Sequence, residues 1–270
     1  MGSVSSRPLV WTVPAAAGLC AAVLSVAGLN EGLFHALNAA ASGGAALWSS
    51  VTVMGDALFV LVLFLPFVVR RPDIVWAAIL AALVATFASH VFKELLELPR
   101  PAAVLDRETM HIIGPVLKKH AFPSGHATAA FTFASVVALR LARAPVSAAV
   151  ITLAAIVALS RVVVAAHWPV DVFGGAAVGW LSGLAAVTLA ERWRWGLRRG
   201  PQRAFGLFLL GCAVWLFVYD TGYPLGIPIQ RVAAVACIAV AAWNVWRQWA
   251  GEGSARKEEG AAGKGFSNRL

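Results

Sequence analysis

The sequence predicts an all-α fold, a helical bundle that crosses a membrane several times. Hydrophobic residues make up 60% of the 270 positions and charged residues only 13%, whereas about a quarter of the residues in a soluble domain are charged. The apolar residues also gather into long segments, and about 20 such residues suffice to cross the hydrocarbon core of a membrane. Together these observations predict a polytopic membrane protein and exclude a soluble globular one.

Eight apolar segments are interpreted as membrane spans. In chain order they cover residues 9–29, 51–69, 74–96, 126–142, 146–165, 170–190, 204–219 and 229–250. The stretch 30–48 has the pattern of an amphipathic or re-entrant piece at the membrane interface. We therefore expect one integral membrane domain over residues 1–250, with a catalytic core near 51–190 and an accessory pair of spans within 204–250. The polar segment 251–270, rich in small residues, is predicted to be a disordered tail.

The basic residues are divided unequally between the two sides of the membrane. With a cytoplasmic N-terminus, the cytoplasmic loops and the tail contain 15 of the 22 Lys and Arg residues, and the opposite side contains seven. Because the side richer in Lys and Arg faces the cytoplasm, both termini are predicted to be cytoplasmic. The loop 97–125 then faces the periplasm of a bacterial inner membrane. This orientation explains the net charge of +9 better than nucleic-acid binding does.

Three polar clusters interrupt the apolar pattern, and all three fall on the predicted outward side. The first, KELLELPRP, ends the third span, and the second, PSGH, opens the fourth. The third, SRVVVAAHWPVD, joins the fifth span to the sixth. Between His126 and Ser160 lie 33 residues, enough for the chain to cross the membrane and return. The spacing therefore predicts that the second and third clusters meet at one surface.

The cations and the second cluster predict a site for a phosphate group. Lys93, Arg100 and Arg161 carry three positive charges in an apolar chain, where isolated charges are costly and usually functional. Arginine is suited to bidentate contacts with oxyanions, and lysine offers a point charge. Ser124 and Gly125 directly precede a predicted helix, where free backbone N–H groups and the helix dipole favour an anion.

The two histidines predict covalent phosphoryl chemistry. Asp171 follows His167 by four residues, and its carboxylate can accept a hydrogen bond from one imidazole nitrogen while the other stays nucleophilic. His126 has no such partner in the sequence and suits a general acid. Because the cations neutralise the phosphate charge, the predicted site needs neither a metal ion nor another cofactor.

Each of these features, taken alone, also fits a structural role. A single Arg at the end of a span commonly snorkels to the interface, and PSGH also fits a plain helix cap. Agreement in order, spacing and side of the membrane favours a functional site. Asp56 is assigned to a helix terminus rather than to this site, and the small-residue stretch 174–183 is predicted to be a close helix-packing face.

The three clusters together resemble the signature of the type-2 phosphatidic acid phosphatase superfamily, which reads Lys-x6-Arg-Pro, Pro-Ser-Gly-His and Ser-Arg-x5-His-x3-Asp. The resemblance implies an all-helical six-span core, beyond which the last two predicted spans have no assigned role. It implies that His167 attacks phosphorus to form a phosphohistidine, that Asp171 orients His167, and that His126 protonates the leaving oxygen. The residues implied to bind the phosphoryl oxygens are Lys93, Arg100, Ser124, Gly125 and Arg161.

The resemblance further implies a metal-independent phosphatase that acts on a membrane lipid at the outer leaflet. On family analogy, undecaprenyl diphosphate is the favoured substrate, and phosphatidylglycerol phosphate, phosphatidate and lipid A 1-phosphate are the other candidates. Two alternatives stay open: a phosphotransferase that uses the same intermediate, and a non-catalytic lipid transporter or scaffold. The expected partner is a lipid substrate and not a nucleic acid, and the oligomeric state is open.

Overall fold

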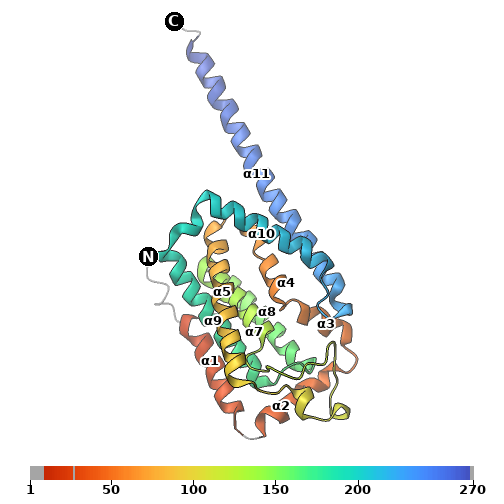
Figure 1. The fold of residues 1–270 in the computed structure, drawn as a ribbon. Coiled ribbons are helices and arrows are strands. Elements are labelled where there is room, and N and C mark those ends of the chain that lie inside the picture. Colours follow the sequence, from red (N-terminus) through yellow and green to blue (C-terminus); the bar gives the residue numbers. More distant parts are fainter. Residues whose placement is uncertain (1–8, 27, 268–270) are drawn as a thin grey trace.

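The computed structural model describes residues 9–26 and 28–267, and the surroundings of side chains as far as residue 250. Within this part of the chain every regular element is a helix, as predicted, and the helices form a bundle from which the last one projects (Figure 1). The elements are α1 (Leu9–Leu24), α2 (Leu29–Asn38), η2 (Ala39–Ala41), α3 (Ala45–Val53), α4 (Ala57–Val62), η3 (Leu65–Phe67), α5 (Pro72–Leu96), α6 (Pro101–Val104), η4 (Arg107–Thr109), α7 (Gly125–Leu141), α8 (Ala144–Val163), α9 (Pro169–Arg192), η5 (Arg194–Leu197), α10 (Arg199–Val218), η6 (Pro224–Gly226) and α11 (Ile227–Ser267).

The centre of the bundle is the close contact between α7 and α9. A Cβ atom added to Gly175 would lie 2.6 Å from the carbonyl oxygen of Ser124, and one added to Gly179 would collide with the carbonyl of Thr128. Further along α9, Gly183 packs in the same way on α7. Small residues let helix backbones approach this closely in membranes. The predicted packing face within 174–183 is therefore confirmed.

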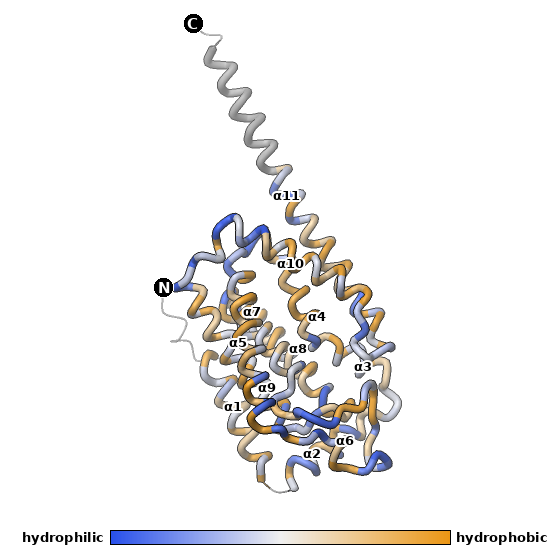
Figure 2. Tube along the Cα trace, viewed as in Figure 1, coloured by the Kyte–Doolittle hydropathy of each residue, from blue (hydrophilic) through white to orange (hydrophobic). Residues whose placement is uncertain are grey.

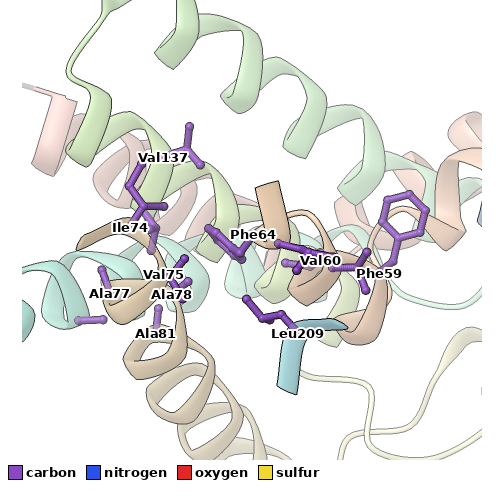
Figure 3. Close-up of a cluster of buried hydrophobic side chains, with 14 of the residues drawn as sticks. Phe59, Val60, Phe64, Ile74, Val75, Ala77, Ala78, Ala81, Val137 and Leu209 are labelled. Carbon is purple, nitrogen blue, oxygen red and sulfur yellow. The ribbon is translucent and has the colours of Figure 1, made fainter. Parts of the chain in front are cut away.

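An apolar cluster joins α4, α5, α7 and α10. Figure 3 shows Phe64 facing Ile74 and Val137, with Leu209 of α10 on the other side of the cluster. All four side chains are buried. Because α10 contributes a buried residue to this cluster, the first accessory helix is packed into the bundle.

Hydrophobic residues run along the helices between two polar ends (Figure 2). One polar end is the turn from α9 into α10, and the other contains α6 and the loop that leads to α7. In the described part of the chain, five helices are long and apolar enough to cross a membrane, or up to seven if each of two bent helix pairs counts as one span. The chain is a multi-pass membrane protein, and the exact number of eight spans stays a prediction.

The first two predicted spans differ from the structure, because the helix of the first ends early and the second is broken. Within 9–29, α1 ends at Leu24, and α2 is inclined to it by 106° and begins after Gly28, whose φ of 82° lies in the left-handed region. Within 51–69, α3 and α4 are inclined by 58°. The carboxylate of Asp56 accepts hydrogen bonds from the backbone N–H groups of Leu58 (2.8 Å) and Phe59 (3.4 Å) and caps α4. The assignment of Asp56 to a helix terminus is thus confirmed.

Helix α11 extends to Ser267. The disordered tail over 251–270 stays a prediction. Residues 268–270 of the predicted tail lie outside the described residues.

Candidate active site

The three polar clusters of the sequence come together at the end of the bundle that contains α6. Lys93 lies in the last turn of α5, and Arg100 is the residue before α6. Ser124 and Gly125 are at the start of α7, and Arg161 is in the last turn of α8. His167 lies two residues before α9, and Asp171 is in the first turn of α9. The backbone N–H of Ser124 donates to the carbonyl of Asp171 at 3.0 Å, which ties the second cluster directly to the third.

His167 is held at both ring nitrogens. Its Nδ1 lies 3.3 Å from Oδ2 of Asp171, and its Nε2 lies 3.0 Å from Nη1 of Arg100. A guanidinium is only a donor, so Nε2 must accept that hydrogen bond and carries the lone pair. The proton of the neutral ring then sits on Nδ1 and is donated to Asp171. The geometry therefore assigns the tautomer in which Nε2 is the nucleophilic atom.

The surroundings of His167 also favour its neutral form. The side chain is 2% exposed and lies in the turn between α8 and α9. Burial, followed by the positive charges of Arg100 and Arg161, holds the pKa of His167 well below its ordinary value. His126 and Lys93 act on its pKa in the same direction, which places all of these groups around one site. At neutral pH the imidazole is uncharged, and Nε2 carries a lone pair that Arg100 holds in place.

Asp171 is fixed by a second donor. The backbone N–H of Trp168 donates to the same Oδ2 atom at 2.9 Å, and the carboxylate is 1% exposed. Pro169 begins α9 at a position where a helix needs no N–H donor. Two donors therefore converge on one carboxylate oxygen, which keeps the imidazole of His167 in one orientation.

All three nitrogen atoms of the Arg100 guanidinium donate hydrogen bonds to backbone carbonyl groups. Its Nε donates to the carbonyl of Lys119 (2.7 Å), its Nη1 to that of Ala166 (3.0 Å) and its Nη2 to that of His120 (3.3 Å). It therefore joins the loop before α7 to the turn that carries His167. A contact of Arg100 with phosphoryl oxygens remains a prediction, and in the structure it positions the nucleophile.

The start of α7 offers donors to an anion. Ser124 is the N-cap, but its side chain makes no capping hydrogen bond, and within the described part of the chain its fully buried Oγ has no partner. The first backbone N–H groups of a helix lack intrahelical acceptors. The Nζ of Lys93 lies 3.7 Å from the point where a Cβ of Gly125 would stand. The ammonium of Lys93 therefore lies close to the start of α7, and the binding of a phosphoryl group there stays a prediction.

Two side-chain hydroxyl groups accept hydrogen bonds from the same nitrogen of Arg161. Its Nη1 donates to the hydroxyl oxygens of Thr52 and Tyr223, the latter at 2.9 Å. Its buried Nε has no hydrogen-bond partner among the described residues. Neither hydroxyl residue belongs to the three sequence clusters. The position of Tyr223 in a polar break between the last two apolar segments, on the same side as PSGH, is the signal that points to it.

A cavity of about 440 Å³ reaches three of the cluster residues and is otherwise lined mostly by apolar side chains, and His167 is not among its lining residues. Lys93, Gly125 and His126 line its polar part, and Phe64 and Ala82 are among its apolar walls. The cavity lies between α4, α5 and α7. A larger cavity of about 1270 Å³, between η3, α10 and α11, contains no residue of the three clusters.

Comparison with known proteins agrees with the geometry. The PAP2 superfamily model matches residues 74–195. The solved structure of LpxE from Aquifex aeolicus is 27% identical, with a TM-score of 0.55, and the match covers 61% of this chain and 98% of that one. The solved structure of the first transmembrane PAP2 type phosphatidylglycerolphosphate phosphatase from Bacillus subtilis is 22% identical, with a TM-score of 0.50. That match covers 68% of this chain and 98% of the other one. A search of curated proteins found no match. Residues 74–195 of the chain therefore match the PAP2 superfamily, and the fold resembles that of two membrane phosphatases.

Proposed function

We propose that the protein is a membrane lipid phosphatase that works through a phosphohistidine on His167. The observation that carries the proposal is the fixed, neutral imidazole, held between Asp171 and Arg100 with the lone pair of Nε2 directed away from the carboxylate. Phosphatase chemistry uses such a group as a nucleophile toward phosphorus.

In the first step Nε2 of His167 forms a bond to phosphorus, and the bond between phosphorus and the lipid oxygen breaks. His126 gives a proton to the departing oxygen. In the second step His126 takes a proton from water, the water oxygen attacks phosphorus, and the bond to His167 breaks to release inorganic phosphate. Asp171 stabilises the charge that the His167 ring gains when Nε2 becomes bonded to phosphorus.

The charge of the phosphoryl group is neutralised by protein cations. Lys93 and Arg161, with the hydroxyl and backbone N–H groups at the start of α7, surround the place where the equatorial oxygens would lie. Preorganised donors of this kind each contribute about 10²–10³ in rate. We therefore propose that turnover needs no metal ion. Activity in excess EDTA supports this, and loss in EDTA that a divalent ion restores would contradict it.

The shape of the site fits a lipid. The cavity joins Lys93, Gly125 and His126 to apolar walls on the flank of the bundle, so a lipid tail can stay in the bilayer while its phosphate enters the site. With the proposed orientation, this site opens to the outer leaflet of a bacterial inner membrane. Undecaprenyl diphosphate is our first candidate, and phosphatidylglycerol phosphate, phosphatidate and lipid A 1-phosphate are the others.

The test is release of inorganic phosphate from these four lipids by the purified protein in detergent. The expected result is hydrolysis of at least one lipid, lost in His167→Ala and accompanied by inhibition with vanadate. Labelled phosphate that appears on a second lipid instead of in solution would show a phosphotransferase. Full biological activity of His167→Ala would favour a transporter or scaffold and refute the proposal.

A further inference from the structure

The turn between α10 and α11 places a tyrosine beside the phosphate site. Tyr223 lies outside the part of the chain that matches the family model, and its side chain is 2% exposed. Its hydroxyl accepts a hydrogen bond from Nη1 of Arg161 at 2.9 Å. The guanidinium carbon also lies 5.5 Å from the centroid of the tyrosine ring, within the range of a cation–π contact. One side chain of the accessory helix pair thus holds a signature arginine in two ways.

The turn that carries Tyr223 is itself packed into the bundle. A Cβ atom on Gly226 would lie 2.6 Å from a side-chain carbon of Val53 in α3. Gly114, in the loop before α7, has a φ of 83°, and a Cβ there would collide with the ring of Tyr223. The position of the ring is therefore fixed from two sides, by α3 and by the loop before α7.

Helix α3 contributes the second hydroxyl to the same nitrogen. Thr52 accepts from Nη1 of Arg161 through its Oγ1, and Thr52 is fully buried. A guanidinium Nη1 has two N–H groups, so Thr52 and Tyr223 together use both of them. The rotation of the guanidinium is thereby set, and its Nε, which has no partner among the described residues, is kept for another acceptor.

We infer that Tyr223 is a positioning residue of the phosphatase: it fixes the guanidinium of Arg161 in the orientation that binds the phosphoryl group. This inference rests on the proposed function. It gives the α10–α11 pair a role, because these helices complete the site by delivering a side chain that the matched part of the chain lacks.

The experiment compares Tyr223→Phe with Tyr219→Phe, since these are the only two tyrosines of the chain. Tyr219 directly follows α10, at the start of the segment that contains Tyr223, and its side chain is 36% exposed. Removing a hydrogen bond to a charged group should lower kcat/KM about tenfold to a hundredfold in Tyr223→Phe. Tyr219→Phe should stay within about twofold of the wild type. Both variants keep the ring, so the melting temperature in detergent should change little.

Two further readouts separate positioning from a merely structural role. In an Arg161→Ala background, adding Tyr223→Phe should lower kcat/KM by less than about a further twofold. Tyr223 acts on the reaction through the guanidinium of Arg161, which that background already lacks. Vanadate should bind more weakly to Tyr223→Phe by a factor similar to the loss in kcat/KM. Wild-type kcat/KM in Tyr223→Phe, or the same loss with and without Arg161, would overturn the inference.

Vanadate binding also distinguishes a failure of this inference from a failure of the proposed function. A wild type that releases no phosphate but binds vanadate would refute the phosphatase, and weaker binding by Tyr223→Phe would still support the role of Tyr223. Equal vanadate binding by the two proteins would overturn that role. A wild type that neither releases phosphate nor binds vanadate would overturn both.

Discussion

Replacing Asp171 with Asn tests how the nucleophile is oriented. Two donors, Nδ1 of His167 and the backbone N–H of Trp168, converge on Oδ2 of Asp171. If the NH₂ group of the asparagine took the position of Oδ2, it would face the backbone N–H of Trp168, and two donors cannot pair. The amide oxygen should therefore take that position. Both hydrogen bonds and the tautomer of His167 are then kept. What is lost is the negative charge that stabilises the developing imidazolium.

The magnitude follows from that difference. Hydrogen bonds to charged groups contribute about 1.5–3 kcal/mol and neutral ones about 1 kcal/mol. The difference of about 0.5–2 kcal/mol lowers kcat roughly 2-fold to 30-fold, because each 1.36 kcal/mol is tenfold in rate. The NH₂ group would replace Oδ1, which has no partner among the described residues, so the wild type and the variant each bury one unpaired polar group at this place. Asp171→Ala leaves both donors unpaired, so its kcat should fall further.

The assay is steady-state phosphate release, with the folded fraction of each variant measured by size-exclusion chromatography in detergent. The expected order of kcat is wild type, Asp171→Asn, Asp171→Ala and His167→Ala. If a folded Asp171→Asn protein were as inactive as His167→Ala, the reasoning that the amide oxygen preserves the tautomer would be refuted. Unchanged kcat in Asp171→Asn would refute the contact itself.

Three other predictions concern pH, packing and orientation. Because the pKa of His167 is lowered, its neutral form persists as the pH falls. The acid limb of the pH profile of kcat/KM, corrected for the ionisation of the substrate, should therefore lie below pH 6.5. An acid limb above pH 6.5 would contradict this. Gly179→Ala places a Cβ against the carbonyl of Thr128 and should destabilise the protein by about 1–3 kcal/mol. Gly211→Ala, with nothing within 4 Å of its Cβ, should leave the melting temperature unchanged or raise it. A cysteine at position 111, in the loop before α7, should react with an impermeant thiol reagent in intact cells, and absence of reaction there would reverse the proposed orientation.

The sequence predicts the helical class and the meeting of the three clusters because both depend on local signals. Long apolar segments specify helices in a membrane, and the 33 residues between His126 and Ser160 return the chain to the same side. The packing of α9 on α7 is also visible in the sequence, since the glycines of 174–183 fall within one helix.

The remaining features depend on contacts between distant residues. Hydropathy does not show that one helix ends before Asp56 and that α4 begins after it, because the segment is apolar on both sides of that residue. Thr52 and Tyr223 reach Arg161 from 109 and 62 positions away in the sequence, and neither belongs to a motif. The backbone contacts of Arg100 are equally hidden, because their acceptors are carbonyl groups that any residue type supplies.

The most direct test of the account is to trap the covalent intermediate. The protein is mixed with a lipid substrate labelled with ³²P in the reacting phosphate, quenched in alkali within one turnover, and digested to locate the label. We expect an alkali-stable, acid-labile phosphate on the peptide that contains His167, absent from His167→Ala. Complete turnover without any labelled peptide, or a label that persists in His167→Ala, would contradict it.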